Sequence, residues 1–192
     1  MGKGRLEIFT DGVIAVIITI MVLEIGAPPG PDFAALSASL PILFTYALSF
    51  LILGIFWNNH HHMLHAATGV DGKVLWANLF LLFWLSLIPF VLNWIDKTGF
   101  KSLPIASYGF VLLMAAIGYH WLQQAIIARD GRTSALAAAV GHDFKGKLSI
   151  VLYIAAIGMA FLREWAALSI YVVVTLLWLI PDRRIEGSGK TE

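Results

Sequence analysis

The sequence predicts an all-α polytopic membrane protein with six transmembrane helices. The first observation behind this fold class is composition. Hydrophobic residues make up 59% of the 192 residues and charged residues only 13%, so a soluble chain of this size would carry more apolar surface than it could bury. The second is that the apolar residues gather into long segments. A helix of about 20 apolar residues is what a bilayer core of roughly 30 Å requires.

The apolar segments end at residues that stop helices. The first is followed by Gly26, Ala27, Pro28, Pro29, Gly30 and Pro31, where proline cannot continue a helix and glycine favours a turn. The last two helices are short, and we expect a tight hairpin between them at Arg163 and Glu164. We expect the alanine-rich segment 133–140 to extend the fourth helix or to lie at the membrane surface. The six expected helices cover residues 6–25, 40–63, 74–95, 105–128, 148–162 and 165–180.

The basic residues predict which way these helices run. With six spans, ten lysines and arginines fall on one side of the membrane and three on the other. Because cytoplasmic loops carry the excess of basic residues, both termini are predicted to be cytoplasmic in a multi-pass protein of the cell membrane. Residues 1–181 are expected to form one membrane domain, and residues 182–192 a short cytoplasmic tail. The ten are Lys3, Arg5, Lys73, Arg129, Arg132, Lys145, Lys147, Arg183, Arg184 and Lys190, and the three are Lys97, Lys101 and Arg163.

Several classes of function find no support in the sequence. The chain has no cysteine, which excludes disulfides and thiolate metal sites, and a net charge of +1 gives no support for binding nucleic acid. It has no phosphate-binding glycine loop, nucleophile elbow or paired carboxylate motif, so we predict neither an enzyme nor a cofactor. The Thr-Val-Gly-Tyr-Gly filter of ordinary potassium channels is also absent, so any ion selectivity needs another source.

A set of polar residues is expected at one depth in the bundle. It contains Asp11 in the first helix, Asn58, Asn59 and His60 at the end of the second, and Asn78 in the third. Ionisable groups inside a span are costly and face protein or water. We interpret the set as a structural layer that joins three helices, and a gate or a proton-sensitive element is the alternative.

Neighbouring histidines raise the question of a metal site. His61 and His65 have the spacing of four residues that lets two imidazoles on a helix share one ion. No carboxylate accompanies them in the sequence, and we predict no metal.

One stripe of the first helix could line a pore. Gly12, Val16, Thr19 and Leu23 recur at spacings of four, three and four residues, with Ile20 beside them. A stripe of small and branched apolar residues is typical of a packing or lipid-facing surface. The pattern alone therefore leaves the function of this face open.

The sequence that begins at Arg5, RLEIFTDGV, resembles the signature of the transmembrane-protein-175 family of potassium channels. In that signature an arginine and three further residues precede Phe-Ser-Asp, which here are Phe9, Thr10 and Asp11; Thr10 keeps the hydroxyl of the serine. Three further stretches resemble the same family, so the likeness covers nearly the whole chain. They are residues 57–62, residues 78–83 with Ser86 and Pro89, and residues 178–183.

The resemblance implies a potassium-permeable homotetramer in the lipid bilayer, with four first helices around the pore. By that resemblance Val16 and Leu23, with Ile20, form the apolar constriction, and Thr19 occupies its hydroxyl-bearing position. Val16 is smaller than the residue often found there, which favours Leu23 as the narrowest point. A ring of apolar side chains gates by dewetting and favours ions that shed water readily. The resemblance assigns a structural and gating role to Arg5, Phe9, Thr10 and Asp11. Asn58, His60 and Asn78 are predicted to belong to the structural polar layer described above.

Other functions compete with a channel. A secondary transporter would carry an inverted repeat with a matching pair of broken helices, and Pro89 alone does not make one. A membrane enzyme built on the histidines and Asp11 would need an acceptor pocket that the sequence does not identify. A membrane scaffold subunit without activity of its own is the third alternative.

Overall fold

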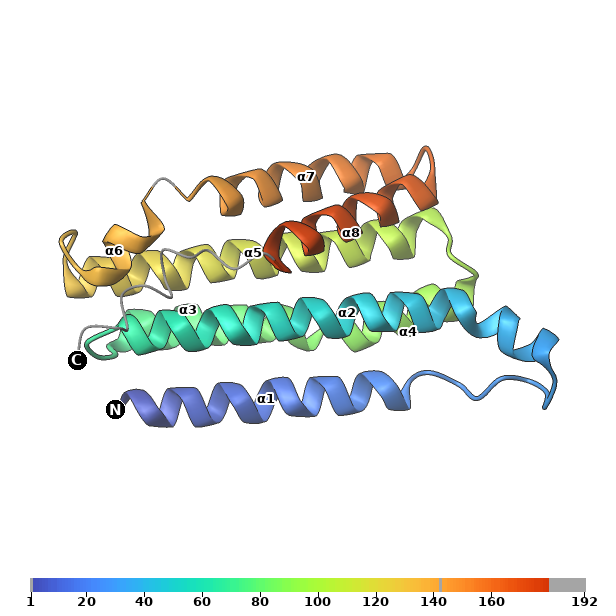
Figure 1. The fold of residues 1–192 in the computed structure, drawn as a ribbon, viewed down its shortest axis with the longest axis horizontal. Coiled ribbons are helices and arrows are strands. Elements are labelled where there is room, and N and C mark those ends of the chain that lie inside the picture. Colours follow the sequence, from blue (N-terminus) through green and yellow to red (C-terminus); the bar gives the residue numbers. More distant parts are fainter. Residues whose placement is uncertain (1, 142, 180–192) are drawn as a thin grey trace.

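Helices make up the whole architecture of residues 2–141 and 143–179, the part of the chain that the computed structural model describes (Figure 1). No strand occurs in this part, which confirms the all-α prediction. The helices are α1 (Lys3–Leu23), α2 (Phe33–Ala66), α3 (Gly72–Ser86), α4 (Ile88–Thr98), α5 (Ser102–Asp130), α6 (Ala135–Val140), α7 (Phe144–Ala160) and α8 (Glu164–Leu179).

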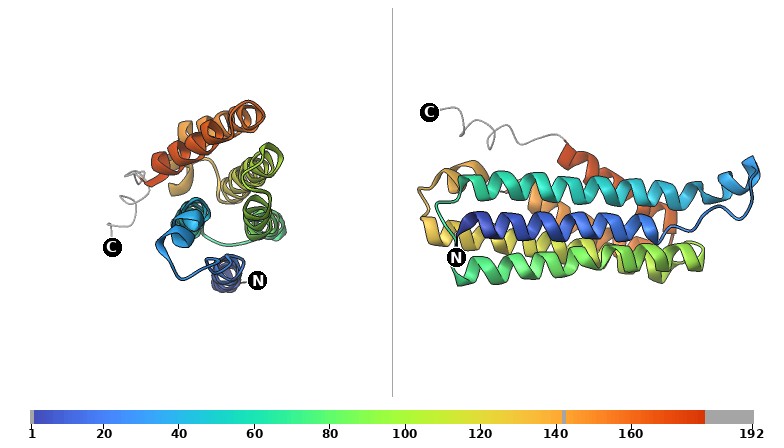
Figure 2. Two further views of the ribbon diagram at one scale, coloured as in Figure 1. Left: turned by 90° about the vertical axis from the view of Figure 1, so that its right-hand side faces the viewer. Right: turned by 90° about the horizontal axis from the view of Figure 1, so that it is seen from below.

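The long helices run up and down along a common axis, with α3 and α4 end to end as one rod (Figures 1 and 2). Within the described residues, α1, α2, the α3–α4 rod and α5 are each long and apolar enough to cross a membrane. The chain is thus a polytopic membrane protein by the length and composition of its helices. The helices α7 and α8, of 17 and 16 residues, are shorter and form the predicted hairpin.

The third expected helix is broken in the structure. It was predicted as one helix over residues 74–95, but α3 ends at Ser86 and α4 begins at Ile88. Pro89 causes the break, because it has no N–H to donate and its ring clashes with the carbonyl group four residues earlier. Leu85 and Ile88, on either side of the break, are both fully buried, so the rod stays packed where its hydrogen bonding is interrupted.

The second helix begins seven residues earlier than predicted, at Phe33. The Asp32 side chain caps it, since its Oδ1 accepts a hydrogen bond of 2.7 Å from the backbone N–H of Ala35. Pro41 lies inside the helix, and Thr45 donates its hydroxyl proton to the Pro41 carbonyl oxygen at 3.0 Å. The first turns of α2 consequently project beyond the end of the bundle (Figures 1 and 2).

The alanine-rich segment does not extend the fourth span, contrary to the first of the two expectations for it. Gly131, with φ of +96°, ends α5, and the Ser134 hydroxyl caps the separate helix α6 by accepting from the N–H of Ala137 at 3.3 Å. The other boundaries lie within four residues of the predicted ones. The predicted end of the last helix at residues 180–184 and the tail over 182–192 lie outside the described residues.

The helix α5 packs against the α3–α4 rod on one side and against α7 and α8 on the other. Its approach to α3 is close at Gly118, where a Cβ atom would lie 3.0 Å from the Leu81 Cα. The helix α1 lies at the edge of the bundle and packs on α2, α3 and α4, as the end-on view in Figure 2 shows. One side of α1 is therefore left without a helix over it.

Candidate functional site

The helix α1 has one packed face and one open face. Its buried residues recur at spacings of four, four, three and four, which is the pattern of a single helical stripe. The opposite face is apolar but exposed. The buried residues are Leu6, Thr10, Ile14, Ile17 and Met21.

Every residue predicted to line a pore lies on the open face. Val16 is 56% exposed, Ile20 43% and Leu23 77%, and Thr19 is exposed as well. Thr19 donates its hydroxyl proton to the Ala15 carbonyl oxygen at 2.9 Å, which leaves the hydroxyl oxygen as an acceptor on the open face. Four neighbouring side chains of α1 are thus turned away from the subunit's own core.

A groove of about 1160 Å³ runs between α1 and α4 beside this face. Gly12, Val16 and Ile20 form part of its α1 wall, and Pro89 and Phe90 form part of the wall at the start of α4. Leu23 and Thr19 do not line the groove. The predicted pore residues therefore divide into those that border the groove and those that face directly outward.

A buried chain of hydrogen bonds joins α1, α3 and α2. Asn78 donates from Nδ2 to the Thr10 hydroxyl oxygen at 3.0 Å, and its Oδ1 lies 2.8 Å from Nε2 of His60. Thr10 and Asn78 are 0% exposed and His60 is 2% exposed. Since the amide oxygen can only accept, the proton of this second bond lies on His60 Nε2. Two residues of the predicted polar layer, His60 and Asn78, therefore meet Thr10 of the signature.

The other predicted members of the layer and signature lie outside this chain. The Asp11 carboxylate accepts a hydrogen bond of 2.8 Å from the Trp57 indole N–H, and both side chains are exposed. Phe9 is 48% exposed and lines the groove, and Arg5 and Asn58 are exposed. The pairing of Asp11 with Trp57 was not predicted, because nothing in the sequence connects two residues 46 positions apart.

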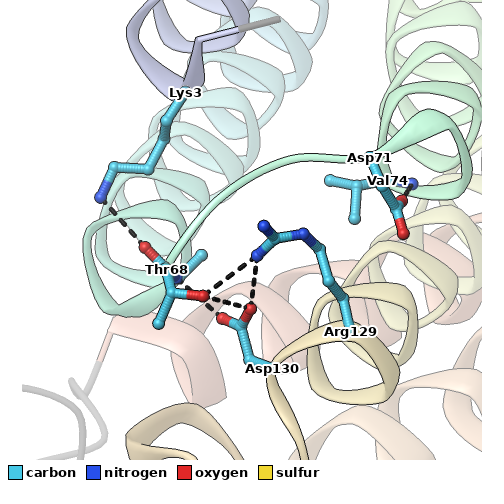
Figure 3. A network of polar contacts seen from close by, with 7 residues as sticks. Lys3, Thr68, Asp71, Val74, Arg129 and Asp130 are labelled. Atoms are coloured by element: carbon cyan, nitrogen blue, oxygen red, sulfur yellow. Dashed lines mark hydrogen bonds and ion pairs between the residues drawn. The ribbon is translucent and has the colours of Figure 1, made fainter.

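A second polar network, which the sequence did not predict, ties the α2–α3 connection to the end of α5 (Figure 3). Asp130 accepts from the Thr68 N–H at 2.8 Å and from the Thr68 hydroxyl at 2.6 Å. Arg129 Nη1 donates to the Thr68 hydroxyl oxygen at 3.0 Å and to Asp130 at 2.7 Å. Lys3 at the start of α1 donates to the Ala67 carbonyl oxygen at 3.2 Å. The start of α1, the α2–α3 connection and the end of α5 are therefore bonded together at the end of the bundle that holds the N-terminus.

The exposed histidines form a row along α2. The rings of His61 and His65 stack with centroids 6.3 Å apart, and Trp57 stacks on His61 at the same distance. Within residues 2–141 and 143–179, no three histidine, cysteine or carboxylate side chains come together as a group that could hold a metal ion.

Comparison with known proteins places the chain in a family. The sequence model of the endosomal/lysosomal potassium channel TMEM175 matches residues 5–89, which include the signature, the polar layer and Pro89. A potassium channel of Chryseobacterium sp. (strain P1-3) is 48% identical to the chain over 190 residues, which cover 99% of each protein. The chain belongs to the TMEM175 family. The family assignment made from RLEIFTDGV and the three further stretches is confirmed.

Two further TMEM175 proteins show how far the likeness extends. The crystal structure of a lysosomal potassium-selective channel TMEM175 homolog from Chamaesiphon minutus superposes with a TM-score of 0.77. It is 24% identical and covers 94% of this chain and 97% of its own, which shows a shared fold. The human endosomal/lysosomal proton channel TMEM175 is 33% identical over 96 residues, or 43% of this chain and 19% of the human protein.

Proposed function

We propose that the chain is one subunit of a homotetrameric potassium-permeable channel, with the open face of α1 from each subunit lining the pore. The observation that carries this proposal is the exposure of Val16, Thr19, Ile20 and Leu23 on a helix whose opposite face is packed. In the membrane, the exposed face of α1 is covered by lipid, by another subunit or by an ion path. Membership of a family with relatives named as potassium channels favours the ion path.

A single α1 cannot enclose a path for an ion, so the pore needs several copies around an axis. Closed rotational symmetry is the usual arrangement of identical subunits. In a ring, the outward face of each α1 turns to the axis, and the groove between α1 and α4 offers an apolar surface to the neighbouring subunit. We propose four copies, as the family resemblance implies.

The proposed constriction acts through the cost of removing water. A ring of Leu23 side chains has no polar atom to replace the water that an ion loses, so the ring imposes a desolvation barrier. Potassium holds its hydration shell less tightly than sodium and therefore meets the lower barrier. The Thr19 hydroxyl oxygen, about one turn of helix from Leu23, supplies the nearest side-chain acceptor on the same stripe.

The buried chain of Thr10, Asn78 and His60 is proposed to hold α1 at a fixed rotation. Its three side chains come from three helices, and α1 contributes one from its packed face. Turning α1 about its axis would break the bond to Asn78 and leave a buried amide without a partner, which is costly. In this way the polar layer keeps Val16 and Leu23 turned to the pore.

The membrane orientation completes the proposal. The excess of basic residues at the end of the bundle that holds the N-terminus is expected to face the cytoplasm, with both termini on that side of the cell membrane.

Ion flux into liposomes that contain the purified protein tests the function. A channel gives single-channel current steps and a potassium permeability above that for sodium. Saturable counterflow without such steps would instead support the transporter, and an absence of flux in protein that is folded and inserted would support the scaffold.

A further inference from the structure

A cavity lies between α2, α5, α7 and α8, and none of the residues lining it comes from α1. Its volume is about 50 Å³. A buried water needs roughly 10 to 15 Å³ by such a measure and benzene about 150 Å³, so the cavity has room for several waters or for one ligand of a few non-hydrogen atoms. Most of its lining is aliphatic or aromatic, and a smaller polar part includes a carboxylate.

The aromatic part of the lining presents rings from three helices. Phe56 of α2 and Tyr119 of α5 lie edge to face with centroids 6.0 Å apart, and Trp178 of α8 lies 6.4 Å from Tyr119. The Trp178 indole N–H donates to the Ser149 hydroxyl oxygen at 2.8 Å, which fixes the orientation of the indole. The faces of such rings carry a negative electrostatic potential and attract cations.

The polar part of the lining is centred on Asp143, which precedes α7. Its side chain is 15% exposed, and its Oδ1 caps α7 by accepting from the Gly146 N–H at 3.2 Å. Its Oδ2 lies 3.1 Å from Nδ1 of His120 on α5. The His120 imidazole is its ion-pair partner. The carboxylate places a negative charge at this end of the cavity.

The carboxylate is held in place by the backbone beneath it. A Cβ atom at residue 146 would lie 2.6 to 2.7 Å from the two Asp143 oxygens, so a side chain there would push the carboxylate out of its capping position. Asp143 itself has a left-handed conformation with φ of 41°, which asparagine and aspartate tolerate better than most residues. The negative charge is therefore positioned by the fold.

We propose that this cavity binds a small organic ammonium ion. The apolar part of such a ligand packs among Phe56, Tyr119 and Trp178, while its N–H groups donate to the Asp143 carboxylate. The carboxylate favours positive charge and the rings offer apolar contact to the rest of the ligand, so together they select a small cation with an apolar part. A neutral ligand of the same shape gains only the packing, and an anion is repelled.

Calorimetric titration of the full-length protein in lipid nanodiscs tests the proposal with methylammonium, which is small enough for the cavity, as the probe and methanol as its neutral analogue. We expect saturable binding of methylammonium. Asp143→Asn removes the charge but keeps a good capping side chain. It should weaken methylammonium binding about tenfold or more, as expected for a lost hydrogen bond to a charged group. The affinity for methanol should not change.

Two control variants separate this site from general effects. Asp32→Asn also removes the charge of a capping carboxylate, but at the start of α2 outside the cavity, and it should leave the affinity unchanged. Ala116→Leu fills the cavity without touching the carboxylate and should abolish binding of both probes, which keeps the test decisive if Asp143→Asn fails to fold.

Three results would overturn the proposal. They are an absence of saturable methylammonium binding, an equal affinity in Asp143→Asn and the parent, and unchanged binding in Ala116→Leu. The measured affinity should be the same in sodium and in potassium salts of equal ionic strength. Displacement by potassium alone would show that the cavity is an inorganic cation site instead.

Discussion

The side-chain amide group of Asn78 connects α3 to both α1 and α2. Its nitrogen donates to Thr10 of α1 and its oxygen lies against His60 of α2, in a region from which water is excluded. Each of these groups would cost more to leave unpaired than its hydrogen bond contributes when formed. The arrangement of α1 is therefore sensitive to the loss of any one member.

Thr10→Val is predicted to destabilise the protein by about 1 to 3 kcal/mol, because valine has a similar shape and leaves the Asn78 amide without an acceptor. Thr19→Val is the matched control in the same helix. Thr19 bonds only to the backbone of its own turn and is exposed, so its replacement leaves no buried partner unpaired. Thermal unfolding of the solubilised protein measures both, and equal shifts in the two variants would contradict the prediction.

Leu23→Ser is predicted to increase the current and to weaken the preference for potassium over sodium, since it replaces an apolar ring by hydroxyl groups that can solvate an ion. Val22→Ser is the control. Val22 is 47% exposed but lies about 100° round the helix from Leu23. Met21, on the packed face, is 0% exposed, so a polar residue there would test folding and not the pore. Reversal potentials in potassium and sodium gradients give the answer, and unchanged values for Leu23→Ser would remove Leu23 from the constriction.

The residues of the site were predictable where a local pattern placed them. Thr10, His60 and Asn78 are polar residues inside apolar helices, and the directions of these helices bring them to one depth. The partner of Asp11 was not predictable, because a tryptophan near the end of a span, such as Trp57, is typical of the membrane interface and does not indicate a hydrogen bond. The network of Thr68 and Asp130 joins residues 62 positions apart, and loop residues carry no periodicity that could indicate the pairing.

At the scale of helices, the existence and order of the long elements followed from the sequence because a bilayer demands long apolar runs. Their details depended on single residues. Pro89 lies at a break between two helices, whereas Pro41 remains inside one, and the sequence does not distinguish the two cases. Asp32 caps α2, but the start of this helix was predicted at residue 40, seven residues too late.

The contact between α3 and α5 depends on a residue without a side chain. Gly118→Ala is predicted to destabilise the protein, because the new Cβ would meet the Leu81 Cα at 3.0 Å and a backbone atom cannot move aside locally. Such overpacking costs typically about 1 to 3 kcal/mol. Gly158→Ala on α7 is the control, since no atom lies within 4 Å of its Cβ position and alanine favours the helix. Opposite shifts of the unfolding temperature are expected, and a stabilising Gly118→Ala would show that the two helices can separate without cost.

For the whole molecule, the two ends of the bundle differ in charge and in hydrogen bonding. The end with the N-terminus holds Lys3, Arg129 and the α2–α3 connection in one network (Figure 3). The other end carries the projecting first turns of α2. A bundle with such different ends has a preferred direction of insertion.

Cysteines introduced at Thr133 and Ala34 are predicted to react from opposite sides of the membrane, Thr133 from the cytoplasm and Ala34 from outside. Both residues are exposed, and the chain contains no other cysteine, so labelling reports on one site in each variant. A membrane-impermeant maleimide applied to sealed cells, and then to opened cells, makes the measurement. Labelling of both positions from the same side would refute the orientation.

The final prediction joins the pore face to the oligomer. If the four copies of α1 surround an axis with Leu23 at the narrowest point, the side chains at position 23 from different subunits lie close together there. Leu23→Cys should therefore form disulfide-linked dimers on oxidation, because cysteines bridge only when their Cα atoms lie within about 7 Å. Val22→Cys, turned about 100° away, should form far fewer. Non-reducing gels of protein oxidised in the membrane measure both. Efficient cross-linking at position 22 and none at 23 would place a different face of α1 at the axis, even if the protein proved to be a tetramer.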